Sequence, residues 1–492
     1  MAEPPSSDRP TGAALVEIDP LARELGERFR AAGFELYLVG GVVRDSLLGL
    51  LDPDAELDMA TSAHPDETLR VLKGWADRRY LQGVRFGTVG ARKDDHVFEI
   101  TTFREEMYPE AERKPAVTYA RDVDTDLSRR DFTINAMAVR LPEGEFRDPF
   151  GGLRDLAAKH LDTPLEPEVA FSDDPLRMLR AARFVSQLGV TPSTRVVSAI
   201  ERMRSRLAIV SRERIQDELN KLLLGAEPGR GLQLLCDTKL AEEFIPELPA
   251  LELEQDPIHQ HKDVLRHTFA VIENCEPDLV LRLAALLHDV GKPKTREFTA
   301  EGVQFHHHEV VGARMAEARL RELRYPSSVI DQVRRLIELH LRFHGYGEGW
   351  SDSAVRRFVR DAGPLLDKLN QLTRADVTTG NLFKAKQFRA LQDELEERIA
   401  KLAEQENLEA MRPPLDGHEV MEHLGVPPGP VVGEALAFLM ELRLERGLID
   451  REEAVRLLDE WAAERGVALS GARPAAIPSE NGAAAGDGPA ER

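Results

Sequence analysis

The spacing of apolar residues divides the chain into a front part with strand and helix patterns and a longer part with helix patterns only. Helical spacing predicts a helix over 21–32, the run ELYLVG predicts a strand over 35–40, and a second helix is expected from Val43. TVGARK and HVFEITTF alternate β-branched or aromatic residues with others, which predicts two strands joined by a turn at Asp94. We expect a mixed sheet that ends near Phe150 and therefore an α+β fold.

Beyond Pro175 the spacing is helical, as in LRMLRAARFVSQL and ERIQDELNKLLL, and no further strand is expected. A boundary is predicted at EQDPIHQHKD, before a histidine-rich block that ends near Val377. The Ala, Gly, Pro and Ser content of the last segment cannot bury a core. The predicted parts are a flexible leader over 1–20, an α+β head over 21–160, a helical neck over 161–255, a histidine-rich domain over 256–380, a C-terminal helical domain over 381–466 and a disordered tail over 467–492.

Length and composition narrow the class of protein. A chain of 492 residues is too long for one ordinary domain, and 42% hydrophobic with 31% charged residues is typical of a folded globular protein. Charged residues interrupt every apolar run, and the N-terminus lacks a basic start before an apolar core, so we expect no membrane span, no secretory signal and a cytoplasmic location. Cys236 and Cys275 lie far apart without a CxxC pattern, which argues against a disulfide framework or a cysteine zinc site.

The net charge of −21 by itself argues against nucleic acid as a partner, since phosphate binding needs a basic surface. The stretch from Leu176 to Ile215 is an exception, because its only acidic residues are Glu201 and Glu213. Its basic residues are Arg177, Arg180, Arg183, Arg195, Arg202, Arg204, Arg206, Arg212 and Arg214. A local basic face is therefore expected on an acidic protein.

Two features of the front part suggest phosphate and metal chemistry. Gly40-Gly41 ends a predicted strand and opens a helix that carries Arg44, and backbone N–H groups at such a turn can approach a phosphate closely. Glu56 and Asp58 alternate in AELDMAT, so they share one face of a strand and can hold Mg²⁺ between their carboxylates. Each feature alone also fits an ordinary turn or a solvated strand face.

Two later segments extend this pattern. Glu99 in FEITTFR lies on another strand and can supply a third carboxylate to the same ions. The segment RRDFTINAM is expected to begin a helix, and its arginines offer planar donors for phosphate or sugar oxygens. The polar residues of that segment are Arg129, Arg130, Asp131 and Asn135. The four motifs would rarely occur together, in this order, by chance.

In this combination the sequence resembles the class II CCA-adding enzymes, the tRNA nucleotidyltransferases of the polymerase-β superfamily, which also includes bacterial poly(A) polymerases. The resemblance covers most of the chain and continues through DPFGGLRDL, DDPLRMLRAARF, RERIQDELNKLL and PPGPVVGEAL. It implies a nucleotidyltransferase head, a neck that reads the base and binds RNA, and a C-terminal helical domain that contacts tRNA. It also implies tRNA, CTP and ATP as partners and Mg²⁺ as cofactor.

In that family the acidic pair holds the metal, the GG turn and the RRD segment hold the triphosphate and ribose, and an E-D-x-x-R signature reads the base. The resemblance assigns catalysis to Glu56, Asp58 and Glu99, and nucleotide binding to Gly40, Gly41, Arg44, Arg129, Arg130, Asp131, Asn135, Asp174, Arg177, Arg180 and Arg183. An aspartate accepts from an exocyclic amine and an arginine donates to ring acceptors, which suits both cytosine and adenine. The alternative interpretation of Arg177, Arg180 and Arg183 is that they form one solvent-exposed stripe on a helix.

Two positions depart from the family pattern, and several alternatives stay open. Glu56 and Asp173 stand where the family usually has Asp and Glu, and the longer Glu56 side chain moves its oxygens outward. GVRFGTVGARK resembles the FGT form of CCA-adding enzymes rather than the basic GRRFR form of poly(A) polymerases.

The leading hypothesis is template-independent addition of C, C and A to the tRNA 3′ end. The alternatives are a CC- or A-adding enzyme, a poly(A) polymerase, an HD phosphohydrolase acting on RNA ends, and a non-catalytic tRNA-binding protein.

Histidines and acids at wide spacing predict a second site in the helical part. They are His267 in HKDVLRHTF, His288-Asp289 in LLHDVGK, His308, His340 and Asp376. A lone histidine on an apolar helix is usually structural, but this set is less common and resembles the HD phosphohydrolases. The resemblance implies an HD domain in which His267, His288, Asp289 and Asp376 bind a divalent metal, with extra histidines for a second ion. The sequence leaves open the ion's identity, the phosphate ester and the oligomeric state.

Overall fold

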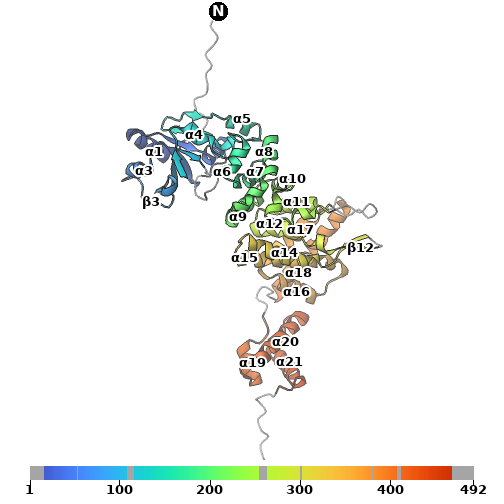
Figure 1. The fold of residues 1–492 in the computed structure, drawn as a ribbon. Coiled ribbons are helices and arrows are strands. Elements are labelled where there is room, and N and C mark those ends of the chain that lie inside the picture. Colours follow the sequence, from blue (N-terminus) through green and yellow to red (C-terminus); the bar gives the residue numbers. More distant parts are fainter. Residues whose placement is uncertain are drawn as a thin grey trace, which may run out of the picture. The chain divides into compact units, whose positions relative to one another are not determined.

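The computed structural model describes residues 16–52, 54–107, 116–253, 263–299, 302–378, 382–406 and 412–467. They belong to two compact units, one of Met1–Leu341 with Lys368–Gly380 and one of Arg342–Asp367 with Asn381–Arg492. The predicted α+β class is confirmed, because a mixed sheet precedes parts that are mainly helical (Figure 1). The predicted tail, most of the leader and most of EQDPIHQHKD lie outside the described residues. Within the leader range, Val16 and Ile18 are buried.

A seven-stranded sheet forms the head, in the order β3-β4-β5-β2-β1-β8-β9. Its strands are β1 (Leu36–Val39), β2 (Leu57–Thr61), β3 (Arg78–Tyr80), β4 (Thr88–Lys93), β5 (His96–Thr102), β8 (Ala138–Leu141) and β9 (Phe146–Arg147). β2 and β5 are parallel, and the other neighbouring pairs are antiparallel. On β5, Phe98 and Ile100 are buried whereas Glu99 is exposed. One face of this part of the sheet therefore packs on the core, and the other is free to carry a site.

The strands predicted from ELYLVG, TVGARK and HVFEITTF are confirmed as β1, β4 and β5, and β9 ends the large sheet close to the expected residue. The first predicted helix is α1 (Pro20–Ala31), where the Asp19 side chain accepts hydrogen bonds from two backbone N–H groups. The other head helices are α2 (Gly41–Leu48), α3 (Pro65–Val71), α4 (Val123–Ser128) and α5 (Gly152–Ala157). Strands β6 (Arg104–Met107) and β7 (Ala116–Tyr119) form a separate pair.

The expectation that a helix begins at RRDFTINAM is wrong. Helix α4 ends just before this segment, Arg129 is its C-terminal cap, and only Thr133–Asn135 form a short 3₁₀ turn before strand β8. The Asp131 carboxylate is buried and accepts from the Phe132 backbone N–H and from side chains. These bonds hold the backbone in a bend, so the segment positions side chains instead of continuing as a helix.

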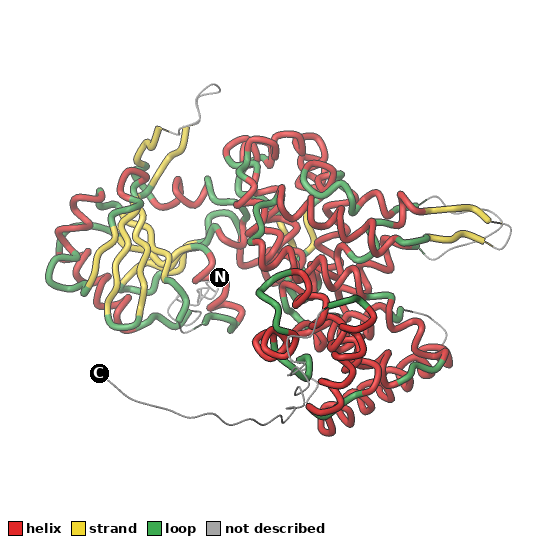
Figure 2. Tube along the Cα trace, turned by 90° about the horizontal axis from the view of Figure 1, so that it is seen from below, coloured by secondary structure: helices red, strands yellow, loops and turns green. Residues whose placement is uncertain are grey.

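The neck consists of α6 (Pro167–Asp173), α7 (Leu176–Leu188), α8 (Thr194–Met203), α9 (Arg212–Leu223) and α10 (Pro228–Asp237). The helices predicted from LRMLRAARFVSQL and ERIQDELNKLLL are confirmed as α7 and α9. The expectation of no further strand is wrong, because β10 (His160–Leu161) pairs with β11 (Thr191–Pro192) and β12 (Arg296–Thr299) pairs with β13 (Gly302–Phe305). The last pair forms the strands that extend from the helical part in Figure 2. Strands this short offer too little alternation to be recognised in sequence.

The remaining helices of the first unit surround the histidine-rich residues. They are α11 (Val264–Asn274), α12 (Leu279–Leu287), α13 (Lys292–Thr295), α14 (His308–Glu322), α15 (Ser327–Leu339) and α17 (Leu366–Asp376). The second unit contains α16 (Asp352–Ala362), α18 (Leu382–Glu406), α19 (Gly417–Leu424), α20 (Pro430–Arg446) and α21 (Arg451–Glu464). Among the described residues, none of these or the other helices combines the length and apolarity that a membrane crossing requires.

Candidate functional site

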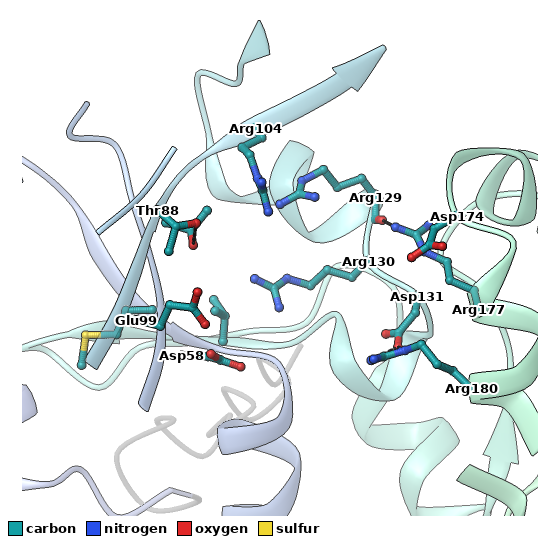
Figure 3. A pocket seen from close by; sticks show the side chains of 13 residues that line it. Asp58, Thr88, Glu99, Arg104, Arg129, Arg130, Asp131, Asp174, Arg177 and Arg180 are labelled. Atoms are coloured by element: carbon teal, nitrogen blue, oxygen red, sulfur yellow. Dashed lines mark hydrogen bonds and ion pairs between the residues drawn. The ribbon is translucent and has the colours of Figure 1, made fainter. Parts of the chain in front are cut away.

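A cavity of about 320 Å³ opens between the exposed face of the sheet and helix α7. Its lining residues are Val39, Asp58, Met59, Thr88, Glu99, Thr101, Arg104, Arg129, Arg130, Asp131, Asp174, Arg177 and Arg180. Figure 3 shows the carboxylates of Asp58 and Glu99 on one side, with Arg130 pointing toward them and further arginines beyond it. A cavity with acids on one wall and guanidinium groups on the other suits a polyanionic ligand bound together with a cation.

Neighbouring strands bring the two cavity carboxylates together. Asp58 on β2 pairs in register with Glu99 on the parallel strand β5, so both side chains project from the same face. Burial raises the pKa of Asp58, Arg130 opposes this shift and Glu56 adds to it, and the net pKa lies above its ordinary value. Burial, Asp58 and Glu56 likewise raise the pKa of Glu99. A cation between the carboxylates would relieve this crowding of negative charge.

Glu56 lies at the edge of the carboxylate pair. It is exposed, lies one residue before β2 begins, and is not among the residues that line the cavity. Its charge is nevertheless close enough to raise the pKa of both Asp58 and Glu99. Glu56 therefore lies beside the carboxylate pair, at the rim of the site.

The GG turn leaves room for an arginine beside these carboxylates. Gly40 has a φ of 74° and precedes α2, whose first residue is Gly41. A Cβ atom at Gly40 would lie 2.8 Å from Arg130 Nη1 and 4.0 Å from Asp58 Oδ2. Glycine is therefore required here both by the backbone conformation and by the space that the Arg130 guanidinium occupies. Neither glycine lines the cavity itself.

A buried carboxylate that the sequence analysis did not single out holds the two arginines of the RRD segment. Asp126 is 1% exposed and accepts from Arg129 Nη2 at 3.0 Å and from Arg130 Nη2 at 3.2 Å. Burial raises the pKa of Asp126, but the two arginines outweigh this and lower it below its ordinary value. The i,i+3 and i,i+4 spacing of an acid before two arginines at the end of a helix is a signal that could have identified Asp126.

A chain of polar contacts runs beneath the cavity. Arg44 donates from Nη1 to Asn135 Oδ1 at 2.7 Å and from Nε and Nη2 to Asp45. Asn135 Nδ2 donates to Asp131 Oδ1 at 3.0 Å, and Arg180 donates to Asp131 Oδ2. Arg44 and Asn135 do not line the cavity. They orient Asp131, which does line it.

The residues expected to read the base lie where α6 meets α7, because Asp174 is the C-terminal cap of α6 and Arg177 is in the first turn of α7. Arg177 donates from Nη2 to the Arg129 carbonyl at 2.6 Å, and Asp174 Oδ2 accepts from Arg214 Nη2 at 2.7 Å. Both Asp174 and Arg177 line the cavity (Figure 3). Their polar groups are thus held by neighbours on the side of the cavity away from Glu99.

The alternative of one solvated arginine stripe on α7 is wrong. Arg183 is 8% exposed and donates from Nη1 to Glu218 Oε1 at 3.0 Å, while its guanidinium lies 4.4 Å from the centre of the Phe184 ring. Glu218, on α9, also lies 3.7 Å from Arg180 Nη1. Glu218 could not be singled out from the sequence, because residue spacing within one helix does not show which residues of another helix pack against it. Arg183 supports the site from within the core and does not line the cavity.

A second cluster lies in the histidine-rich part of the first unit. Its side chains are His267, His288, Asp289, His308, His340 and Asp376. His267 Nε2 lies 2.8 Å from Asp376 Oδ1, and His288 Nε2 lies 3.2 Å from Asp289 Oδ2. His308 Nε2 lies 3.4 Å from Asp289 Oδ1. The structure therefore brings together the four predicted metal ligands and adds the two further histidines.

The histidines of this cluster have the orientation that metal ligands require. The Nδ1 atoms of His288, His308 and His340 lie 2.8, 2.8 and 2.7 Å from backbone carbonyl oxygens, which fixes the rings. The Nε2 atoms of His308 and His340 are buried and have no hydrogen-bond partner among the described residues. Burial lowers the pKa of His340 to about 4, which favours the neutral imidazole that binds metal. The donor set therefore fits one or two divalent cations.

Family models match three consecutive parts of the chain. The Poly A polymerase head domain matches residues 36–162, the "Probable RNA and SrmB- binding site of polymerase A" matches 189–251, and the HD domain matches 264–406. These matches cover the sheet, the neck from α8 onward and the histidine cluster in turn, and they leave out α6 and α7. The head and HD domains both imply dependence on divalent metal ions.

Curated relatives and solved structures extend over most of the chain. The A-adding tRNA nucleotidyltransferase of Deinococcus radiodurans is 33% identical over 87% of this chain and 95% of that protein, and the CCA-adding enzyme of Geobacillus thermodenitrificans is 31% identical over 85% and 91%. With other CCA-adding enzymes, such as that of Latilactobacillus sakei, the chain spans about half of the relative's length, 54%. The crystal structure of the Bacillus stearothermophilus CCA-adding enzyme in complex with CTP matches with a TM-score of 0.66 at 25% identity, over 91% of this chain and 99% of that one.

The long relatives and the structural match agree with the motifs placed around the cavity. Identity above 30% over most of both chains leaves no doubt about common family membership. The chain belongs to the class II CCA-adding enzyme family of tRNA nucleotidyltransferases, with an HD domain after the nucleotidyltransferase head.

Proposed function

We propose that this protein adds C, C and A to the 3′ end of tRNA, using CTP and ATP and no nucleic-acid template. The observation that carries the proposal is the cavity itself, where Asp58 and Glu99 face Arg129 and Arg130 and the D-x-x-R pair at the junction of α6 and α7 completes the wall. Relatives that match most of the chain carry the names CCA-adding enzyme and A-adding tRNA nucleotidyltransferase, so addition of A alone is the main competing function. A cytoplasmic location stays a prediction.

The proposed mechanism assigns the two walls different tasks. Asp58 and Glu99, with Glu56 at the rim, would hold Mg²⁺, and the bound ion would supply activation of the attacking hydroxyl and charge neutralisation for the leaving pyrophosphate. Arg129 and Arg130 would bind the triphosphate through charge-assisted hydrogen bonds. Asp126 keeps both guanidinium groups oriented before the nucleotide arrives, so little side-chain freedom is lost on binding.

Base selection is assigned to the junction of α6 and α7, which carries Asp174 and Arg177. The Asp174 carboxylate can accept from the exocyclic amine that cytosine and adenine share, and Arg177 can donate to their ring acceptors. The contacts from Arg214 to Asp174 and from Arg177 to the Arg129 carbonyl fix both groups beside the cavity. Protein side chains would thus do the work of a template base.

Extension of defined transcripts tests this function. Purified protein with Mg²⁺ receives tRNA transcripts that lack CCA, end in C or end in CC, together with CTP, ATP or both, and products are separated at single-nucleotide resolution. Addition of CCA that then stops is the expected result. Growth of only the CC-ended transcript with ATP would show an A-adding enzyme, and untemplated long A tails would show a poly(A) polymerase.

We infer a second, phosphohydrolase activity at the HD cluster, because six metal-binding side chains converge there and the buried Nε2 atom of His340 has no hydrogen-bond partner in the part of the chain that the structure describes. A bound divalent cation would supply a nucleophilic water for hydrolysis of a phosphate ester. An RNA ending in a 2′,3′-cyclic phosphate and one ending in a 2′-phosphate are the substrates to test with Mg²⁺, Mn²⁺ or Ni²⁺. Release that a chelator abolishes supports the activity, and no turnover of either RNA with any of the ions contradicts it.

A further inference from the structure

The exposed face that carries the carboxylates continues to the edge strand of the sheet. Tyr80 on β3 pairs in register with Gly90, Gly90 with Glu99, and Glu99 with Asp58. Residues paired across neighbouring strands project from the same face. At about 4.8 Å per strand, Tyr80 stands about 10 Å from Glu99 in the same row. The row therefore leads from the carboxylate pair to an aromatic ring.

Gly90 leaves room for that ring. A Cβ atom at residue 90 would lie 3.1 Å from Tyr80 Cβ and 3.2 Å from its Cδ2, so the tyrosine covers the place where a side chain would stand. Tyr80 is nevertheless 42% exposed. An aromatic side chain with this much exposed surface is available to pack against a ligand. The sheet thus presents an open ring on the carboxylate side of the cavity.

Basic side chains accompany the ring on the same face. Arg78 lies two residues before Tyr80 on β3 and pairs in register with Arg92 on β4, so both arginines project on the Tyr80 side. Both are exposed. An aromatic ring with neighbouring guanidinium groups is the kind of surface that binds single-stranded nucleic acid, with bases on the ring and phosphates on the cations.

We propose that Tyr80 positions the 3′ end of the tRNA, with one of its last bases stacked on the ring and a neighbouring phosphate on Arg78. This inference rests on the nucleotidyl transfer proposed above. The residues assigned to the incoming nucleotide, Asp174 and Arg177, lie on the other side of the cavity from Glu99 (Figure 3). The strand whose 3′-hydroxyl attacks therefore approaches over β4 and β3.

RNA binding tests the role of Tyr80 without any turnover. An acceptor-stem hairpin with an unpaired 3′ extension and the same hairpin with a blunt end are titrated with protein and followed by fluorescence anisotropy. Tyr80→Ala is expected to weaken binding of the extended hairpin by roughly 5- to 150-fold, the factor that stacking on one aromatic ring contributes, and to leave the blunt hairpin unaffected.

Two variants serve as controls. Tyr80→Phe keeps the ring and should bind like the wild type, and Leu81→Ala removes a neighbouring side chain that is 59% exposed but has no π face. Unchanged binding of the extended hairpin by Tyr80→Ala overturns the proposal. An equal loss on both hairpins overturns it as well, because a general defect would then explain the result.

Steady-state extension provides the kinetic readout. Tyr80→Ala should raise the KM for tRNA by the same factor and leave the KM values for CTP and ATP unchanged, and Tyr80→Phe should restore the KM for tRNA. A parallel rise in all three KM values contradicts the assignment. If the wild-type protein extends no transcript, the proposed transfer fails, whereas the hairpin titration still decides whether Tyr80 holds an RNA end.

Discussion

Arg180 donates from both Nε and Nη2 to the same carboxylate oxygen of Asp131, at 2.8 and 2.5 Å. Arg180 belongs to α7 in the neck, whereas Asp131 lies in the bend after α4 in the head. Asp131 is 7% exposed, and its other oxygen accepts from Asn135. An ion pair between a buried carboxylate and a partly exposed guanidinium therefore fixes helix α7 against the segment assigned to the triphosphate.

Arg180→Ala should destabilise the first unit because it leaves Asp131 buried without its cation. Removing one partner of a buried pair typically costs about 3 kcal/mol in the free energy of unfolding, which urea unfolding followed by circular dichroism would measure. Arg30→Ala is the matched control, since Arg30 pairs with Glu143 where both side chains are largely exposed, at 60% and 42%. That variant should lose less than about 1 kcal/mol. Equal losses in the two variants would contradict the role given to the buried pair.

Asp131 also predicts how stability depends on pH. Burial raises the pKa of its carboxyl, but Arg180 and Asn135 outweigh burial and hold the pKa well below its ordinary range. The pair's contribution is then fully present above the unfolded-state pKa of about 3.9 and declines as the pH falls below it. Unfolding measured at pH 7, 5, 4 and 3 should show a smaller acid-induced loss for Asp131→Asn than for the wild type. Parallel curves for the two proteins would contradict this assignment.

The residues that the sequence predicted best are those whose position depends on local pattern. Strand alternation identified Glu99, and the G-G motif identified the glycine that Arg130 approaches. Strict alternation also placed Glu56 beside Asp58, but it did not show that Glu56 lies one residue before the strand begins and outside the cavity lining. The strand's first residue depends on its pairing partners, which a single sequence does not show.

The features that the sequence analysis missed depend on contacts between segments far apart in the chain. Asp131 is separated from Arg180, and Arg183 from Glu218, by tens of residues, and burial of these charges follows from how α7 packs on the head and on α9. The bend at the RRD segment has the same origin, since its carboxylate is engaged by α7 instead of capping a helix. Helix periodicity predicted α7 correctly but could not tell which of its arginines faces the core.

Asp58→Asn should abolish nucleotide incorporation while tRNA binding persists. An amide is a poor ligand for Mg²⁺, and loss of the metal removes several kcal/mol of transition-state stabilisation, equivalent to a rate decrease of at least about 1000-fold. Single-turnover incorporation of labelled CTP and ATP measures the rate, and filter binding measures the tRNA affinity. Asp54→Asn changes a nearby exposed carboxylate and should leave the rate unchanged. Wild-type turnover by Asp58→Asn would remove Asp58 from the metal site.

Asp174→Ala should reduce the use of both nucleotides, because it removes the acceptor proposed for the exocyclic amine. The expected decrease in kcat/KM for CTP and for ATP is about 5- to 150-fold, the discrimination carried by one good base contact. The KM for tRNA should change little. Asp217→Ala removes an exposed carboxylate from the neighbouring helix α9 and is the control. Unaltered kcat/KM for both nucleotides would assign base reading to other residues.

His288→Ala should lose the metal of the HD cluster and keep nucleotidyl transfer, because the cluster contributes no residue to the cavity of the head. His288 Nε2 lies close to Asp289, Asp376 and His267, so its removal takes a ligand from the centre of the cluster. Elemental analysis of protein loaded with Mn²⁺ and then desalted measures the bound metal. His423→Ala, which changes a histidine paired with Asp459 in the second unit, should retain the bound metal.

Asp376→Asn gives a second test with a nearly isosteric change if the buried alanine variant does not fold. Full metal content in a folded cluster variant would contradict the ligand assignment, whereas loss of CCA addition together with the metal would contradict the independence of the two sites.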